Sequence, residues 1–238
     1  MSTKTHYEYA KKHYRDPAVA AQYESWRFLT PKGQARNRRK LAAVKRALSR
    51  AASLGTPVKL GIDLPCGTGR LIPLLVQEKI EFVSSDISFE MMQVARSKLT
   101  TEADSRLNLG FVQCDGESLP YKGNCVDAFF CIRFMFHVHR EARQAIMREM
   151  ARVSRRWLII DFRHKYNFRW LGWRLRQLLG LLPNIEYRFS RSALEQELAE
   201  VGLRLVEIFP THSRWTRWFS DKWVVLIEKK EGTPLDGT

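Results

Sequence analysis

The sequence predicts an α/β fold: a doubly wound, mostly parallel, seven-stranded sheet with an antiparallel last strand. Short apolar segments alternate with helix-forming segments from residue 58 to residue 162. Such alternation is typical of parallel strands joined by right-handed crossovers. The first strand runs into a turn that contains Gly67 and Gly69, as at the ligand-binding edge of doubly wound sheets. The length of 238 residues and the hydrophobic content of 45% suffice for one folded core.

The residues before Gly55 predict helical structure, because Leu41, Val44 and Leu48 recur at helical spacing. The charged face of this helix is expected to contain Arg38, Arg39, Lys40, Lys45 and Arg46. The glycine at position 55, followed two residues later by a proline, ends the helix.

Seven apolar segments are predicted as strands: residues 58–64, 81–85, 109–113, 126–132, 157–162, 203–209 and 223–228. The fourth is almost entirely apolar, as a strand buried on both faces should be. The last two are expected to pair antiparallel, because a short connection joins them. Helices are predicted at 70–78, at 88–99 with Ser88 as N-cap, at 140–153, and from a capping box at Ser192 and Glu195 to Gly202.

The net charge of +15 is concentrated in two segments. Residues 1–59 hold 14 Lys and Arg against 3 Asp and Glu, and residues 151–189 hold 9 against 2. This excess favours an anionic partner, namely a phosphorylated substrate, a membrane surface or RNA. The alternative is a solvated basic surface without a partner.

Composition also limits the setting and the chemistry. No apolar run approaches the roughly 20 residues that span a bilayer, and the first residues lack an apolar signal core, so a cytoplasmic location is expected. The four cysteines form no C-x-x-C pair, which predicts reduced, buried thiols and no metal site.

Carboxylates follow three successive predicted strands, at Asp63, Asp86 and Asp115. Carboxyl ends of parallel strands meet at one edge, where an acid can accept both hydroxyls of a ribose. Gly67 and Gly69 allow a ligand to approach the backbone closely, and the following helix N-terminus offers free N–H groups to a carboxylate. Together these features predict a nucleoside pocket. The dinucleotide fingerprint fails because Ile72 takes its third glycine position, and no P-loop is present.

The pattern resembles class I S-adenosylmethionine-dependent methyltransferases, in particular the ubiquinone/menaquinone-type subgroup. The resemblance covers roughly residues 58–162, and more weakly the segment to 229. It depends on the motifs Asp63-Leu-Pro-Cys-Gly-Thr-Gly-Arg70, Ser85-Asp86-Ile87-Ser88-x-x-Met91-Met92, Asp115-Gly-Glu-Ser-Leu-Pro120, Val126-Asp127, Phe136-His137-Val138 and Glu149-Met-Ala-Arg-Val153.

The resemblance implies roles for individual residues toward S-adenosylmethionine. Asp63, Gly67 and Gly69 would hold its amino-acid portion, and Asp86 its ribose hydroxyls. The remaining implied contacts are Ile87 and Met91 near the adenine, Asp115 and Gly116 at the adenine edge, and Cys131, with Ile132 and Arg133, beside the sulfonium.

Two positions depart from the family pattern. Pro65 stands where glycine is usual, and proline fixes φ and removes one N–H. Phe136 replaces the first residue of a common histidine pair, which weakens the transfer of a catalytic role to His137. The histidines at 137, 139 and 164 are candidate bases, and the alternative for each is a structural or surface histidine. His137 is the catalytic prediction.

The predicted organisation is an N-terminal helical lid or extension at 1–57 and a methyltransferase domain at 58–238 with a helical insertion at 163–188. In the resembled family a segment such as residues 14–28, which is rich in aromatic side chains, often lies over the cofactor. The alternative is that these aromatics pack a helix against the domain. Apolar residues flanked by Trp and Arg in 163–182 suit a helix in a membrane interface, or one that covers the substrate pocket. A second cluster of Trp and Arg at 214–218 is predicted to join that membrane contact.

Three functions remain open at this point. The first is methyl transfer to a small-molecule or lipid-linked acceptor, favoured by the basic, lipophilic insertion. The second is an RNA methyltransferase that uses the basic N-terminal segment, against which no Asn/Asp-Pro-Pro-Tyr-type motif follows the fourth strand. The third is a non-catalytic binding module, against which the intact cofactor positions argue.

Overall fold

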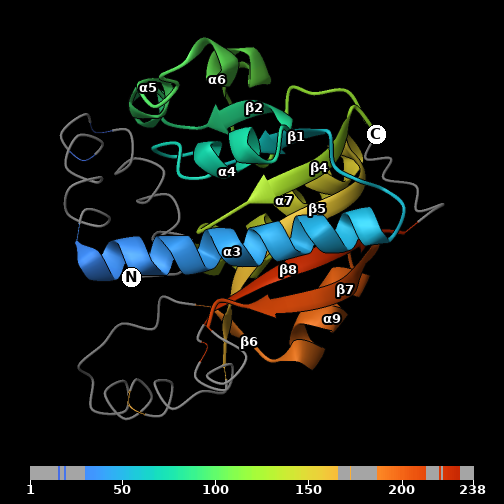
Figure 1. Ribbon diagram of the computed structural model, residues 1–238. Coiled ribbons are helices and arrows are strands. Elements are labelled where there is room, and N and C mark those ends of the chain that lie inside the picture. The colour runs from blue at the N-terminus through green and yellow to red at the C-terminus, as the bar shows by residue number, and fades with distance from the viewer. Residues whose placement is uncertain are drawn as a thin grey trace.

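The computed structural model describes residues 30–165, 187–212 and 222–230, together with Asp16, Val19, Gly172 and Ser220. Its centre is one sheet whose main path has the order β3-β2-β1-β4-β5-β8-β7, with the short β6 paired to β5 (Figure 1). The strands are β1 (Leu60–Asp63), β2 (Glu81–Asp86), β3 (Asn108–Gln113), β4 (Val126–Cys131), β5 (Ser154–His164), β6 (Arg188–Phe189), β7 (Leu203–Pro210) and β8 (Lys222–Lys229).

The strand directions confirm the predicted fold class. Strands β1 to β6 pair in parallel, whereas β8 pairs antiparallel with both β5 and β7. The reversal in strand order after β1 brings the carboxyl ends of β1, β2 and β4 together at one edge. We call this the carboxyl edge, and the opposite one, where these strands begin, the amino edge. Ligands of doubly wound sheets bind at the carboxyl edge.

Helices cover both faces of the sheet. They are α3 (Pro31–Ser53), α4 (Ile72–Gln77), α5 (Phe89–Arg96), α6 (Glu102–Leu107), the 3₁₀ turn η1 (Met135–His137), α7 (Arg140–Val153) and α9 (Arg191–Ala199). Two core clusters result, one under α7 and α9 and one under α3 and α4. Strand β5 supplies both, because Leu158 and Ile160 point into the first while Trp157 and Ile159 point into the second.

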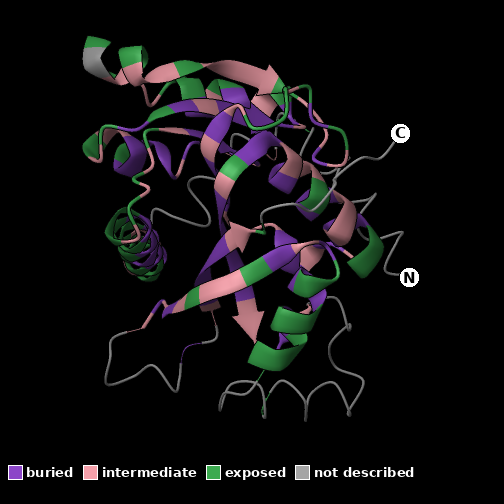
Figure 2. Cartoon of the chain, turned by 90° about the vertical axis from the view of Figure 1, so that its right-hand side faces the viewer, coloured by how far each residue is buried: buried purple, intermediate pink, exposed green. Residues whose placement is uncertain are grey.

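Helix α3 lies across one face of the sheet (Figure 1) and contacts β5, β7 and β8. It begins where Thr30 caps the backbone N–H of Gly33 at 3.1 Å, and Pro31 occupies its first turn. Its buried residues form one side that faces the sheet (Figure 2). The predicted charged face is wrong at one position, because Lys40 is only 3% exposed. It pairs there with Asp161, a strand residue far away in the sequence.

Several local predictions need correction. Helix α9 is capped by Ser190, whose hydroxyl accepts from the N–H of Ala193 at 3.2 Å, and not by Ser192, which lies inside the helix. Helix α6 and strand β6 were not predicted, because they have six and two residues and show no periodicity. Strand β5 continues to His164, two residues into the segment expected as an insertion.

Other predictions fall outside the described residues. These are the aromatic lid segment 14–28 apart from Asp16 and Val19, most of the interfacial helix 163–182, and the tryptophan-arginine cluster at 214–218. Among the described helices, none combines the length and apolarity needed to cross a bilayer. All four cysteines are free thiols.

Candidate functional site

The turn after β1 is shaped by two glycines in the left-handed region, Gly67 with φ +52° and Gly69 with φ +71°. A Cβ on Gly69 would lie 2.8 Å from Cδ1 of Ile72 and 3.1 Å from Ala95. Gly69 therefore allows the turn to pack against α5. A Cβ on Gly67 would meet nothing within 4 Å, so the space beside this residue is open to a ligand. Before both glycines, at the start of the turn, the peptide bond from Leu64 to Pro65 is cis.

Asp86, at the end of β2, joins the turn to the second strand. Its Oδ2 accepts from the N–H of Gly67 at 2.7 Å, and its Oδ1 accepts from the N–H of Ser88 at 3.0 Å. Burial raises the pKa of this carboxyl to about 6, although the hydrogen bonds from Ser88 and Gly67 oppose the shift. The carboxylate thus binds the backbone of the glycine turn.

Asp63 ends β1 and is also buried. Burial raises its pKa well above the ordinary value, the charge of Asp86 raises it further, and Arg133 opposes both. The two acids therefore interact with each other, as the prediction of a shared pocket requires. Two acids held with raised pKa values at a strand edge are typical of a binding or catalytic site.

Asp115 follows β3 close to the same edge. The N–H of Cys114 donates to the carbonyl of Asp86 at 3.0 Å, which places this segment beside the end of β2. Burial raises the pKa of the Cys114 thiol to about 11, and the charges of Asp86 and Asp115 add to that shift. Asp115 itself accepts from the N–H of Glu117 at 3.1 Å. The structure therefore brings all three predicted acids to one edge.

Thr68, between the two glycines, has a buried hydroxyl. The residue is 1% exposed, and among the described residues its Oγ1 has no hydrogen-bond partner. A buried polar group without a partner is unfavourable. A ligand in the turn that donates or accepts a hydrogen bond would satisfy this hydroxyl.

The end of β4 completes the edge. Cys131 is 0% exposed, and burial raises the pKa of its thiol, with further contributions from Asp161 and Asp63. The next residue but one, Arg133, adopts φ +72°. Its N–H donates to Asp161, and its Nη2 donates to Oδ1 of Asn37 at 2.5 Å.

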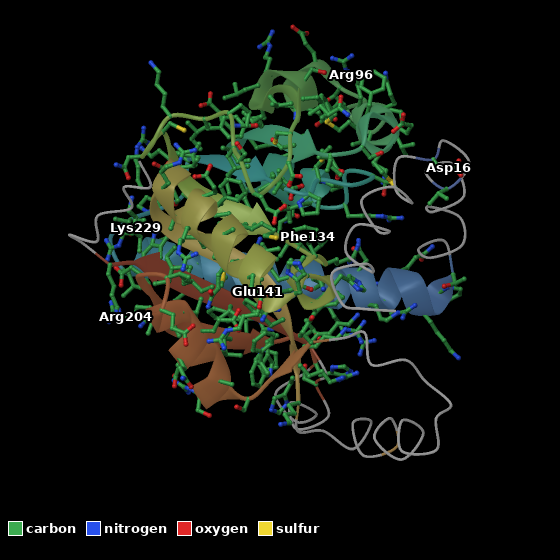
Figure 3. All side chains as sticks on the ribbon, turned by 180° about the vertical axis from the view of Figure 1, so that it is seen from behind. Asp16, Arg96, Phe134, Glu141, Arg204 and Lys229 are labelled. Atoms are coloured by element: carbon green, nitrogen blue, oxygen red, sulfur yellow. The ribbon has the colours of Figure 1, made fainter. Side chains whose placement is uncertain are left out.

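In Figure 3, the labelled residues mark the two edges of the sheet. Phe134, directly after Arg133, lies at the carboxyl edge, whereas Arg204 and Lys229 lie within the paired ends of β7 and β8 at the amino edge. Among the described residues, no group of three or more His, Cys, Asp or Glu side chains is arranged to hold a metal ion.

Comparisons with known proteins address the same part of the chain. Residues 62–156 match a methyltransferase domain family. A ubiquinone/menaquinone biosynthesis C-methyltransferase, UbiE, from Xylella fastidiosa strain M12 is 30% identical over 180 residues, which cover 68% of this chain and 66% of that protein. The aligned chain thus spans slightly less than two thirds of this curated relative.

Solved structures show the same fold. Magnesium protoporphyrin IX methyltransferase (ChlM) from Synechocystis PCC 6803 with bound S-adenosylhomocysteine superposes with a TM-score of 0.68 at 23% identity, covering 92% of this chain and 99% of that one. The same enzyme with bound S-adenosylmethionine gives 0.67 at 19% identity, covering 97% and 98%. The methyltransferase domain match and the UbiE relatives, together with this shared fold, identify the chain as a class I S-adenosylmethionine-dependent methyltransferase. S-adenosylmethionine, the cofactor predicted from the sequence, is the cofactor of this family.

Within this methyltransferase domain, the other predicted cofactor residues have the following places. Ile87 is half-buried just before the N-cap of α5, and its carbonyl accepts from Gln113 at 3.0 Å. Met91 is buried in the first turn of α5, where its N–H donates to Ser88. Gly116 is buried, and a Cβ there would lie 3.2 Å from Leu64. Close core packing therefore explains Gly116 without a ligand.

The three candidate histidines lie in different surroundings. His137 ends η1 and is half-buried, with its ring centroid 4.5 Å from that of Phe136. His139 caps α7 through Nδ1, which accepts from Ala142 at 3.2 Å, so the capping bond explains its presence. His164 stacks on Trp223 at 4.1 Å, and burial lowers its pKa.

Three residues at this edge have roles that sequence reasoning missed: the Thr68 hydroxyl, the buried Lys40 and its partner Asp161. Thr68 lies inside the quoted glycine motif, which is the one signal that could have found it. The pairing of Lys40 with Asp161 joins residues 121 positions apart, and no local pattern reports such a contact.

Proposed function

We propose that this chain transfers a methyl group from S-adenosylmethionine to a small-molecule or lipid-linked acceptor. One observation carries the proposal: Asp63, Asp86 and the glycine turn with its unsatisfied Thr68 hydroxyl converge at the carboxyl edge. The open side of Gly67 and the buried, unpartnered Oγ1 of Thr68 fit a polar ligand seated in the turn. The residues present therefore suit the cofactor of the family.

The proposed contacts follow the strand ends. Asp86 accepts the ribose hydroxyls, while Asp63, Gly67 and Gly69 hold the amino-acid portion together with Thr68. The predicted adenine contacts are Ile87, Met91, Asp115 and Gly116, and the predicted neighbour of the reacting centre is Cys131. Because Cys131 is fully buried, it would shape the end of β4 and would not act as an exposed ligand.

The bound cofactor supplies an electrophilic methyl group on a sulfonium. The chain's own residues then have to align the acceptor and exclude water, and alignment alone can lower a barrier by about 7–11 kcal/mol. A general base is needed only when the acceptor atom must lose a proton. His137, half-buried at the end of the 3₁₀ turn that follows β4, is the proposed base in that case.

Two observations support the acceptor class. The relative from Xylella fastidiosa is named as a C-methyltransferase of ubiquinone/menaquinone biosynthesis, which favours a small, lipophilic acceptor methylated at carbon. The excess of positive charge favours an acceptor that carries negative charge. Peripheral membrane contact through residues 163–182 would give access to such a molecule, and it is part of this proposal.

An RNA acceptor is the second candidate, supported by α3. This helix carries eight Lys and Arg residues and no acid. Four of them already bind within the domain. Lys40 pairs with Asp161, Lys45 with Glu78 and Arg50 with Glu207. Arg46 donates to the carbonyl of Pro210. These contacts reduce the basic surface that remains for phosphates, so we rank RNA second.

Two measurements test the proposal. Calorimetry at pH 7 should detect binding of S-adenosylhomocysteine, and absence of binding would contradict the cofactor assignment. Incubation with radiolabelled S-adenosylmethionine and separated lipid, small-molecule and RNA fractions should label the lipid or small-molecule fraction. Label in RNA, with binding that weakens steeply as salt rises, would favour the second candidate.

A further inference from the structure

A buried polar network joins α3 to the ends of β4 and β5. Asp161 on β5 is 0% exposed and Lys40 on α3 is 3% exposed, and the two form an ion pair. The second oxygen of Asp161 accepts the backbone N–H of Arg133, directly beyond β4. The side chain of Arg133 returns to α3, where Nη2 donates to Asn37 at 2.5 Å. Asn37 and Lys40 are three positions apart and share one face of the helix.

This network holds a backbone position that a non-glycine residue rarely adopts. Arg133 has φ +72°, and such conformations persist only where surrounding contacts fix them. Asp161 supplies that contact through the Arg133 N–H. Lys40 neutralises the carboxylate, which is necessary because a single buried charge is strongly unfavourable. The three groups therefore fix the path of the chain as it leaves β4.

The network also reaches the cofactor acids. Arg133 is close enough to Asp63 to lower its pKa against the effect of burial, and it also lowers the pKa of Lys40. Cys131 is near both carboxylates, since Asp161 and Asp63 each raise the pKa of its thiol. A shift of the α3 face would consequently move Arg133 and the end of β4 next to Asp63.

Attachment of α3 to the sheet does not require these charges. Ala43, Val44, Ala47 and Leu48 are buried on the same helix and belong to the core cluster beneath it. A purely structural contact could be made by an apolar residue at less cost, because replacing buried ion pairs by apolar groups is often neutral or stabilising. The polar network is instead placed where the chain leaves β4.

We propose that Lys40 and Asp161 are positioning residues for methyl transfer, which hold the Arg133 segment in register with the cofactor site. This inference rests on the proposed function and deepens it, because it assigns residues that act through the Arg133 segment and do not themselves contact the cofactor. In this role α3 sets the geometry of the reacting centre from outside the nucleoside pocket.

The test compares the full-length wild type with Lys40→Met, Lys40→Arg and a matched control, Lys45→Met. Lys45 lies on the same helix but is exposed and pairs with Glu78. We expect Lys40→Met to bind S-adenosylhomocysteine within about threefold of wild type, as for a site outside the pocket. Transfer of labelled methyl into a cell extract should fall by about 10- to 100-fold. Lys40→Arg should recover part of the rate, and Lys45→Met should match wild type.

A second readout does not depend on the acceptor. The backbone amide resonance of Arg133 should move upfield in Asp161→Asn, because the hydrogen bond to a carboxylate is lost. If Lys40→Met does not fold, Asn37→Ala replaces it, since Asn37 is uncharged and only half-buried. We expect Asn37→Ala to lower transfer by roughly threefold or more with unchanged S-adenosylhomocysteine binding.

Two results would overturn the inference. The first is a rate of methyl transfer in Lys40→Met equal to that of wild type, or in Asn37→Ala where that variant replaces it. The second is a loss of transfer that is fully explained by a smaller amount of folded protein. A wild type that binds no S-adenosylhomocysteine would instead remove the proposed function. The Arg133 resonance would still decide in that case whether Asp161 holds the β4 end, so the two failures are distinguishable.

Discussion

Aspartates lie at both edges of the parallel sheet, in opposite surroundings. At the amino edge, Oδ2 of Asp127 accepts from the N–H groups of Lys59 and Leu60 at 3.0 Å, and Oδ1 pairs with Arg155 at 2.7 Å. Burial alone would raise the pKa of Asp127, but these partners together lower it below its ordinary value. At the carboxyl edge, burial dominates and raises the pKa values of Asp63 and Asp86.

This difference in pKa distinguishes an aspartate that stabilises the fold from aspartates that are available to bind a ligand. A carboxylate with a lowered pKa contributes stability at neutral pH, whereas one with a raised pKa reduces it. Groups kept in an unfavourable state are typical of binding and catalytic sites. Each prediction below tests this division between Asp127 at one edge and Asp86 with Thr68 at the other.

The largest effect is expected from Asp86→Ala. This change removes the acceptor proposed for the ribose hydroxyls, and loss of hydrogen bonds to a charged group should weaken S-adenosylhomocysteine binding by roughly 10- to 100-fold. Calorimetry on folded protein measures it. Unchanged affinity would contradict the assignment of this edge to the cofactor.

Asp127→Ala should show the reverse pattern. Two backbone N–H groups lose their acceptor, so the free energy of unfolding in urea should fall by about 1–3 kcal/mol. Arg155 adds little to this value because its side chain is 53% exposed. Affinity for S-adenosylhomocysteine should not change, and a large loss of affinity would show that the two edges are not independent.

Cofactor affinity should depend on pH through Asp86. An unfolded aspartate loses its proton near pH 4, whereas Asp86 in the fold keeps it to about pH 6. The stability that the protonated Asp86 carboxyl contributes is therefore fully present below pH 4 and is lost as the pH rises through 6. Binding needs the ionised form, so affinity for S-adenosylhomocysteine should rise about tenfold from pH 5 to pH 7.

The control for this pH dependence is Asp86→Asn. The step centred near pH 6 should disappear in this variant, while any step due to Asp63 remains. Persistence of the full tenfold change would assign the titration to another group.

The smallest effect is expected from Thr68→Val, which replaces a buried hydroxyl by a methyl group of similar size. The fold should be unchanged or slightly more stable, because Oγ1 has no partner among the described residues. Binding of S-adenosylhomocysteine should weaken by the equivalent of about 0.5–1.5 kcal/mol. Weaker folding with unchanged binding would mean that the hydroxyl serves the protein and not the ligand.

Local patterns predicted most of the fold and the cofactor acids. Helix α7 has the predicted bounds, because its buried residues repeat at helical spacing over four turns. Asp63 and Asp86 were found because strand ends follow from apolar segments, and the fold brings such ends together. The N-cap of α9 was misplaced by two residues, since Ser190 and Ser192 are equally suitable by type.

The network behind the site was not predictable in the same way. Lys40 has the spacing of a charged surface residue, and only its contact with Asp161 on a distant strand explains its burial. The left-handed conformation of Arg133 likewise depends on that carboxylate. Burial and backbone conformation at these positions are set by tertiary contacts, which one sequence does not display.

The position of β8 has a consequence for biosynthesis. This strand, the last that the structure describes, lies between β5 and β7. As the chain leaves the ribosome, β7 has no neighbour to pair with and the apolar edge of β5 is uncovered until residues 222–229 emerge. The half of the sheet that contains Asp161 can therefore close only late in synthesis, when exposed strand edges are most prone to aggregate.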